Sequence, residues 1–133
     1  MTLKELSQLY YLIKEIKIDQ LRLEELQAKA EGTSSGFLSE LSKAPNFESK
    51  LEKYIVEKVD LANIIFKKQQ RCIDERARLE QYINDIDDSY TRMIFSLRFI
   101  DGLSWDKVAD HIGGGNTDQS VKKRCYRHLD KSS

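Results

Sequence analysis

Four polar or cationic side chains near the C-terminus lie at the spacing of one helix face: Gln119, Ser120, Lys123 and Arg127. Glutamine can make two hydrogen bonds to the edge of adenine, and lysine or arginine can bond guanine, so these residue types suit the major groove of duplex DNA. A helix turns by about 100° per residue, so placing Val121, Cys125 and Leu129 against a core points those four outward. We expect a helix over residues 117–129 that reads base pairs.

Side chains on the flanks and at the start of this helix are expected to meet phosphates. Cations at the edges of a helix in the groove reach the DNA backbone more easily than the bases, and a helix N-terminus offers N–H groups to a phosphate. The expected phosphate contacts are Asn116, Thr117, Lys122, Arg124, Tyr126 and Lys131. Double-stranded DNA is therefore the expected partner.

A recognition helix needs a shorter helix and a tight turn before it. Ser104 can cap a helix over residues 105–112, in which Val108 faces the core and the small Ala109 lets the next helix approach. Three glycines, 113–115, end that helix and open the turn.

A further helix is expected ahead of these two. Asp88 can cap it, its apolar residues continue to Ile100, and Gly102 ends it. Residues 88–133 are thus expected to form a three-helix domain of the helix-turn-helix type. Trp105 follows a serine cap and is expected to pack at the domain's edge.

This region resembles region 4 of sigma-70-type factors, the part that reads the promoter −35 element. The matching positions are Arg92, Leu97, Arg98, Phe99, Gly102, Leu103, Ser104, Trp105, Val108, Ala109, Ile112, Gly113, Val121, Lys122 and Leu129. The whole chain resembles phage-encoded transcriptional regulators of the ArpU/RinA type. The resemblance implies a sequence-specific DNA-binding regulator from a phage or prophage, with RNA polymerase as a possible second partner. Two features depart from the pattern: the turn after Gly113 is longer than the family's, and nothing in the N-terminal half resembles sigma region 2.

Residues 1–87 are expected to form a long antiparallel helical hairpin of coiled-coil type. Thr2 and Glu5 can form a capping box for a helix that ends near Glu31, and the Gly/Ser-rich stretch 32–46 is expected to be a flexible linker. The apolar stripe of this first helix is Leu9, Leu12, Ile16, Leu23, Leu26 and Ala30, with Asp19 in the same register.

A second long helix is expected over residues 47–86. Its predicted stripe is Leu51, Ile55, Ala62, Ile65, Cys72, Leu79, Ile83 and Ile86. Three polar residues, Lys58, Gln69 and Arg76, fall on the same stripe. The first helix is expected to fold back on this one, and a homodimer through the N-terminal helices is expected to cover the remaining apolar surface.

Composition agrees with an all-α protein and argues against a membrane-spanning or secreted protein. Among 133 residues, 33% are charged, only Pro45 is proline, and the net charge is zero. Residues 92–133 carry 8 Lys+Arg against 5 Asp+Glu, whereas residues 1–91 carry 14 against 17, so the basic part is the predicted DNA-binding part. No transmembrane segment or signal peptide is seen, and a cytoplasmic location is expected.

Neither a cofactor nor an enzymatic site is expected. Cys72 and Cys125 are far apart and form no C-x-x-C pair, and His111 and His128 are isolated, so no metal site is indicated. No nucleophile, base and orienting group can be grouped from the sequence. Two alternatives stay open at this point: a small terminase subunit for DNA packaging, and a coiled-coil interaction protein that binds RNA polymerase or a sigma factor. The operator sequence, and activation as against repression, are left open too.

Overall fold

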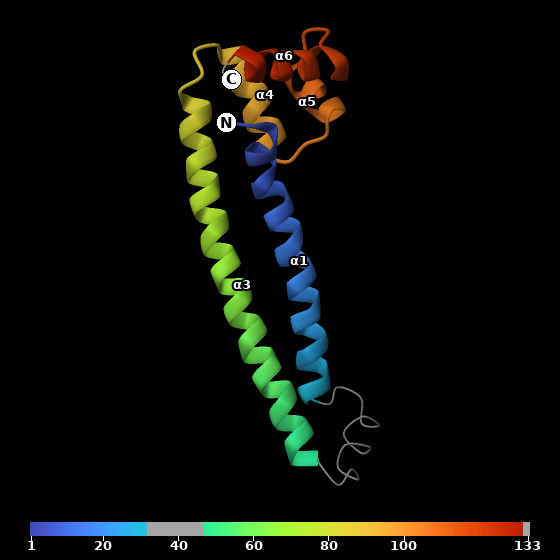
Figure 1. Ribbon diagram of the computed structural model, residues 1–133. Coiled ribbons are helices and arrows are strands. Elements are labelled where there is room, and N and C mark those ends of the chain that lie inside the picture. The colour runs from blue at the N-terminus through green and yellow to red at the C-terminus, as the bar shows by residue number, and fades with distance from the viewer. Residues whose placement is uncertain (32–46, 132–133) are drawn as a thin grey trace. The chain divides into compact units, whose positions relative to one another are not determined.

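The computed structural model describes residues 1–31 and 47–131, and all regular structure in these ranges is helical (Figure 1). The elements are α1 (Leu3–Glu31), α3 (Phe47–Asn84), α4 (Ser89–Phe95), the π-helical η1 (Ser96–Ile100), α5 (Trp105–Ile112) and α6 (Asp118–Lys131). The all-α prediction is confirmed for these residues. The predicted linker, 32–46, lies outside them. None of the described helices has an apolar stretch that could cross a membrane.

The caps predicted from the sequence are present. The Glu5 carboxylate accepts a hydrogen bond from the Thr2 N–H at 2.7 Å, and the Thr2 hydroxyl accepts one from the Glu5 N–H at 3.2 Å. Asp88 accepts from the Thr91 N–H at 3.2 Å, and Ser104 accepts from the N–H three residues on at 3.4 Å. Each cap satisfies an N–H that has no partner inside its helix, so local sequence fixes where these helices begin.

The chain divides into two compact units, Met1–Ile13 with Arg71–Ser133 and Lys14–Gln70. Both α1 and α3 contribute residues to each unit. The core of the first unit consists of Leu6, Leu9, Leu79, Ile83, Ile86, Ile94, Phe95, Phe99, Val108, Ala109, Val121 and Cys125. The predicted domain boundary between residues 87 and 88 falls inside this unit, because the first turns of α1 and the last turns of α3 share a core with α4, α5 and α6.

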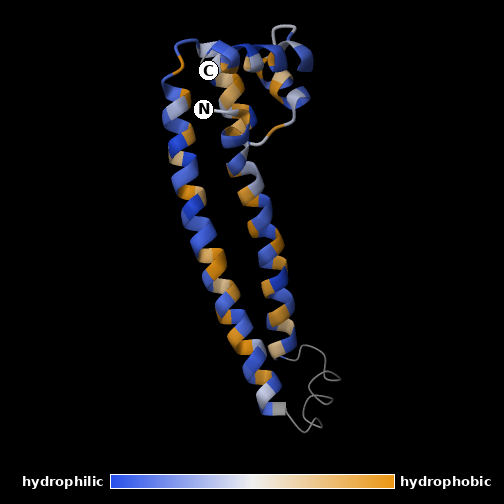
Figure 2. Cartoon of the chain, viewed as in Figure 1, coloured by the Kyte–Doolittle hydropathy of each residue, from blue (hydrophilic) through white to orange (hydrophobic). Residues whose placement is uncertain are grey.

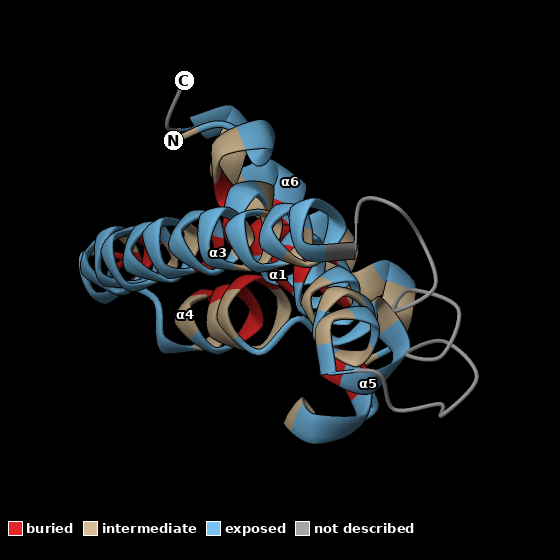
Figure 3. Ribbon diagram, turned by 90° about the horizontal axis from the view of Figure 1, so that it is seen from below, coloured by how far each residue is buried: buried red, intermediate tan, exposed pale blue. Residues whose placement is uncertain are grey.

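The buried side of α1 in the second unit follows the predicted spacing of three and four residues. Ile16 and Asp19 are buried, and Leu23, Leu26 and Ala30 are half-buried. Figure 3 colours the helices by burial. Asp19 is only 5% exposed although it is charged. The sequence therefore placed the inward face of α1 correctly, including its one acidic member.

The predicted stripe on α3 is wrong at several positions. Ile55, Ala62, Gln69 and Arg76 are exposed. The less exposed face runs in strict steps of three and four through Leu51, Tyr54, Lys58, Leu61, Ile65, Lys68, Cys72, Glu75 and Leu79. The helix carries two apolar stripes, and the prediction mixed them.

An ion pair lies on the less exposed face of α3. The Lys68 ammonium lies 2.5 Å from a carboxylate oxygen of Asp19 and 2.8 Å from one of Glu15. Hydrogen bonds to Asp19 and then to Glu15 raise the pKa of Lys68. The ammonium therefore stays charged beside the buried carboxylate of Asp19. Leu61, Ile65 and Lys68 share this face, while Ile55 and Ala62 do not.

We expect Lys68→Met to lower the free energy of unfolding by about 1 to 3 kcal/mol, because Asp19 would remain buried without its main partner. Urea unfolding followed by circular dichroism measures the change. Lys67→Met is the matched control, since Lys67 is exposed, and it should change stability little. Equal effects of the two substitutions would show that the ion pair does not stabilise this unit.

Candidate nucleic-acid interface

The inward face of α6 is the one that the sequence predicts. Val121 and Cys125 are both fully buried, and Leu129 is half-buried against the same core. Burial raises the pKa of the Cys125 thiol to about 12, so it is a neutral core residue at physiological pH. Two buried side chains one turn apart fix the rotation of α6 about its own axis.

That rotation turns three of the predicted base-reading residues to solvent. Gln119, Lys123 and Arg127 are exposed, and Lys123 lies about 180° around the helix from the buried pair. Their side chains form one polar surface of α6. Contact with bases stays a prediction, and the exposure that it requires is present.

Ser120, the fourth predicted base reader, takes part in the cap of α6. Its hydroxyl accepts a hydrogen bond from the Thr117 N–H at 2.9 Å, and the Thr117 hydroxyl accepts one from the Ser120 N–H at 3.2 Å. Thr117 is thus the N-cap residue of α6. The N–H groups of Asp118 and Gln119 are not used by this box.

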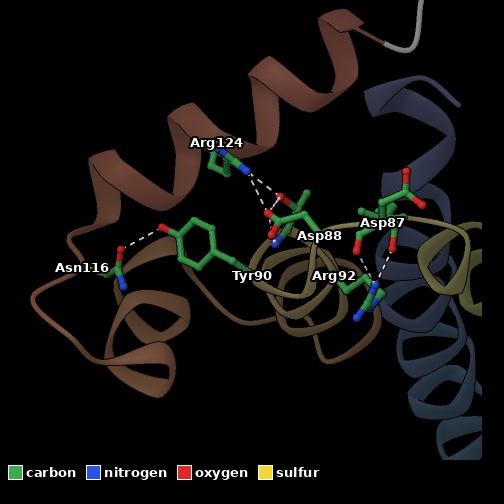
Figure 4. A network of polar contacts seen from close by, with 8 residues as sticks. Asp87, Asp88, Tyr90, Arg92, Asn116 and Arg124 are labelled. Atoms are coloured by element: carbon green, nitrogen blue, oxygen red, sulfur yellow. Dashed lines mark hydrogen bonds and ion pairs between the residues drawn. The ribbon is translucent and has the colours of Figure 1, made fainter.

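Asn116 anchors the turn that precedes α6. Its side-chain oxygen accepts a hydrogen bond from the Tyr90 hydroxyl at 2.7 Å (Figure 4). Its amide nitrogen donates to the Gly113 carbonyl at 2.7 Å. Gly113, Gly114 and Gly115 all have positive φ, between 63° and 78°. Since L side chains rarely adopt this conformation, the triple glycine allows the turn, and Tyr90 ties it to α4.

Arg124, predicted to contact a phosphate, is bonded inside the domain. Its guanidinium lies 2.8 Å from the Asp88 carboxylate and donates to the Thr91 hydroxyl at 3.1 Å (Figure 4). The buried Thr91 hydroxyl in turn donates to Asp88 at 2.6 Å. These three side chains form a closed network, which we call the Asp88 network, that joins the middle of α6 to the start of α4.

The network changes the chemistry of its carboxylate. The hydrogen bond from Thr91, and next the one from Arg124, lower the pKa of Asp88 to about 2. The side chain is therefore charged at any pH at which the protein would act. Sequence reasoning identified Asp88 as a cap but missed Thr91 and Tyr90; a hydroxyl three residues after the cap was the available local signal for Thr91.

Two arginines ahead of α6 also bond to the main chain. Arg92 donates to the carbonyls of Ile86 and Asp87 at 2.6 and 3.0 Å, and so holds the connection between α3 and α4 (Figure 4). Arg98 donates to the Leu103 carbonyl at 2.9 Å. Both are positions of the motif on which the sequence resemblance rests, and both have structural partners here.

Tyr126, another predicted phosphate contact, packs beside Trp105. The two rings meet edge-on with centroids 6.3 Å apart, and the Arg98 guanidinium lies 4.5 Å from the centre of the Trp105 ring. Trp105 is half-buried against the core, as the sequence predicts. Tyr126 is 37% exposed, so part of the residue remains open to solvent.

The charge of α6 is concentrated on its outer and flanking surfaces. The helix carries five lysines and arginines against two aspartates. Lys131 is exposed and Lys122 is half-buried on the opposite flank. Cations on both flanks of an outward polar face can bind a phosphate backbone on two sides. Among the described residues, no group of three or more His, Cys, Asp or Glu could hold a metal ion.

Comparison with known proteins gives no match for this chain among family models, curated proteins or solved structures.

We expect the free energy of unfolding of Asp88→Asn to fall less steeply than that of the wild type as the pH is lowered into the acid range. Asparagine can still cap α4, but it cannot pair as a charge with Arg124. Because the folded pKa is depressed from 3.8 to about 2, the carboxylate's contribution is present above pH 3.8 and is lost as the pH falls through about 2. Urea unfolding at a series of acid pH values measures the slope.

The matched control for this measurement is Asp110→Asn, which removes an exposed carboxylate of α5. The free energy of unfolding of this variant should depend on acid pH as that of the wild type does. If Asp88→Asn and the wild type lose stability in parallel between pH 4 and 2, the Asp88 network does not contribute through its charge.

Proposed function

We propose that the chain is a sequence-specific DNA-binding transcriptional regulator. In this proposal α5, the glycine turn and α6 form a helix-turn-helix, and α6 is the recognition helix that enters the major groove. The observation that carries the proposal is that α6 buries Val121 and Cys125 while Gln119, Lys123 and Arg127 face solvent. One helix thus has an apolar edge for the domain and a polar edge for bases.

The structure of the neighbouring helix supports the proposal. Val108 is fully buried and Ala109 is 3% exposed, so α5 contributes a small residue to the core that it shares with α6. The turn between the helices is held by Asn116 and Tyr90 rather than left free. Rigid placement of a recognition helix is what sequence-specific readout needs, since base contacts depend on the position of each side chain.

We assign Arg124 a positioning role. Its bonds to Asp88 and Thr91 connect α6 to α4, so it contributes to DNA binding by holding the helix in place. Lys122 and Lys131 are the stronger candidates for phosphate contacts, because each projects from a flank of α6. The N-terminus of α6 would offer further N–H groups to a phosphate.

The resemblance to sigma region 4 adds the biological context. It suggests a phage or prophage regulator in which the DNA-binding domain follows a long antiparallel hairpin made by α1 and α3. In such a protein the hairpin would supply self-association or a contact to RNA polymerase. Nothing in the N-terminal half resembles sigma region 2, so we do not propose a complete sigma factor.

The experiment that tests this function starts with selection of bound duplexes from a random library, using the full chain. With the selected site, we expect Lys123→Ala and Arg127→Ala each to relax specificity at one base position by roughly 1 to 3 kcal/mol. Lys122→Ala should weaken all sequences alike and reduce the slope of log affinity against log salt by about one. Fluorescence anisotropy at several salt concentrations measures both effects.

Lys17→Ala is the matched control, because it removes an exposed lysine of α1 in the other unit and should leave affinity and salt slope unchanged. If no duplex is selected, or if all four variants bind alike, α6 is not a recognition helix. A stable complex with RNA polymerase or a sigma factor, without binding to any duplex, would instead support the interaction protein. A ring of many chains would support DNA packaging.

A further inference from the structure

The α3 helix exposes a second apolar stripe in the unit Lys14–Gln70. Ile55, Val59 and Phe66 are 47%, 53% and 60% exposed, and Ala62 is exposed between them. Their spacing of four, three and four residues is that of one coiled-coil seam. The recurring hydrophobic segments along α3 can be followed in Figure 2. Scattered apolar residues need no explanation on a surface, whereas a heptad-spaced row of this kind does.

The direction of this stripe indicates the kind of structure that would cover it. At about 100° per residue, its centre lies about 100° around α3 from the face formed by Tyr54, Lys58, Leu61 and Ile65. A helix in a four-helix bundle has two neighbours at roughly a right angle and therefore two such faces. One of them already pairs with α1, through Lys68 and Asp19. The other needs a second helix.

We propose that the second helix is α3 of another copy of this chain, packed antiparallel along the stripe. The pattern of side-chain sizes supports self-pairing. An antiparallel register that sets Phe66 opposite Ala62 of the second copy also sets Ala62 opposite its Phe66, so the largest side chain meets the smallest one twice. Ile73, which is 61% exposed, continues the row one step beyond Gln69. The same register sets Ile55 opposite Ile73 of the second copy and Val59 opposite its Gln69.

Charge at the two ends of the stripe selects the antiparallel orientation. Glu52 and Arg76 continue the heptad register before Ile55 and after Ile73. In the antiparallel register, Glu52 of each copy faces Arg76 of the other, whereas a parallel pair would set glutamate against glutamate and arginine against arginine. Arg76 pairs with Glu80 at 3.0 Å within its own helix, but both side chains are exposed, so exchanging that partner costs little.

This inference does not depend on DNA binding by α6, and its test is separate. Sedimentation of the full chain should show a reversible dimer. Phe66→Glu should raise the dimer dissociation constant at least about a hundredfold, because two carboxylates would enter an apolar seam without partners. Circular dichroism should show unchanged helix content.

The matched control is Ile64→Glu. Ile64 is 45% exposed on the same helix, but it lies about 170° around α3 from the stripe, and this variant should still dimerise like the wild type. A wild-type chain that stays monomeric, or two variants with the same dissociation constant, would overturn the proposal.

A charge exchange tests the orientation. Glu52→Arg and Arg76→Glu should each weaken the dimer about tenfold, since each places like charges opposite one another at both ends, and the double variant should restore wild-type affinity. In a parallel pair, like charges face each other in the wild type and in every variant. Absence of coupling between the two substitutions would therefore rule out the antiparallel seam.

Discussion

Burial of Val121 and Cys125 sets the rotation of α6, and that rotation decides which of its other side chains face solvent. Both side chains are completely buried, and turning the helix by one residue would expose them and bring Lys122 toward the core. Removing a valine side chain from water stabilises this orientation by roughly 1.5 to 3 kcal/mol, and burial of the cysteine adds to it. The polar face of α6 is the geometric consequence.

Hydrogen bonds around this apolar contact make the orientation specific. Arg124 reaches Asp88 and Thr91 from α6, and Asn116 connects the glycine turn to Tyr90. These bonds hold both the middle of α6 and the turn ahead of it against α4. Arg124 is bonded inside the domain because the Asp88 carboxylate and the Thr91 hydroxyl lie within its reach.

The α3 helix illustrates a different constraint, that one helix can carry more apolar surface than one partner covers. Its less exposed face includes the half-buried Lys58, Lys68 and Glu75, whereas Ile55 and Phe66 remain exposed. If hydrophobicity alone decided, the face with Ile55 and Phe66 would be the less exposed one. The pairing of Lys68 with Asp19 is consistent with the observed choice, since a carboxylate on the inward face of α1 needs a cation opposite it.

Features that depend on near neighbours along the chain could be predicted without the fold: the caps at Thr2, Asp88 and Ser104, the stop and turn at the glycines, the inward stripe of α1, and the apolar edge of α6. These features follow from backbone geometry within one or two helical turns. The fold was needed to show which stripe of α3 is less exposed and which cation of α6 is bonded internally. The partners that decide this, Asp19 for Lys68 and Asp88 for Arg124, lie 49 and 36 positions away along the chain. Periodicity predicts the spacing of residues on a helix face. When two faces have the same spacing, the side chains that the fold places opposite them decide which face is buried.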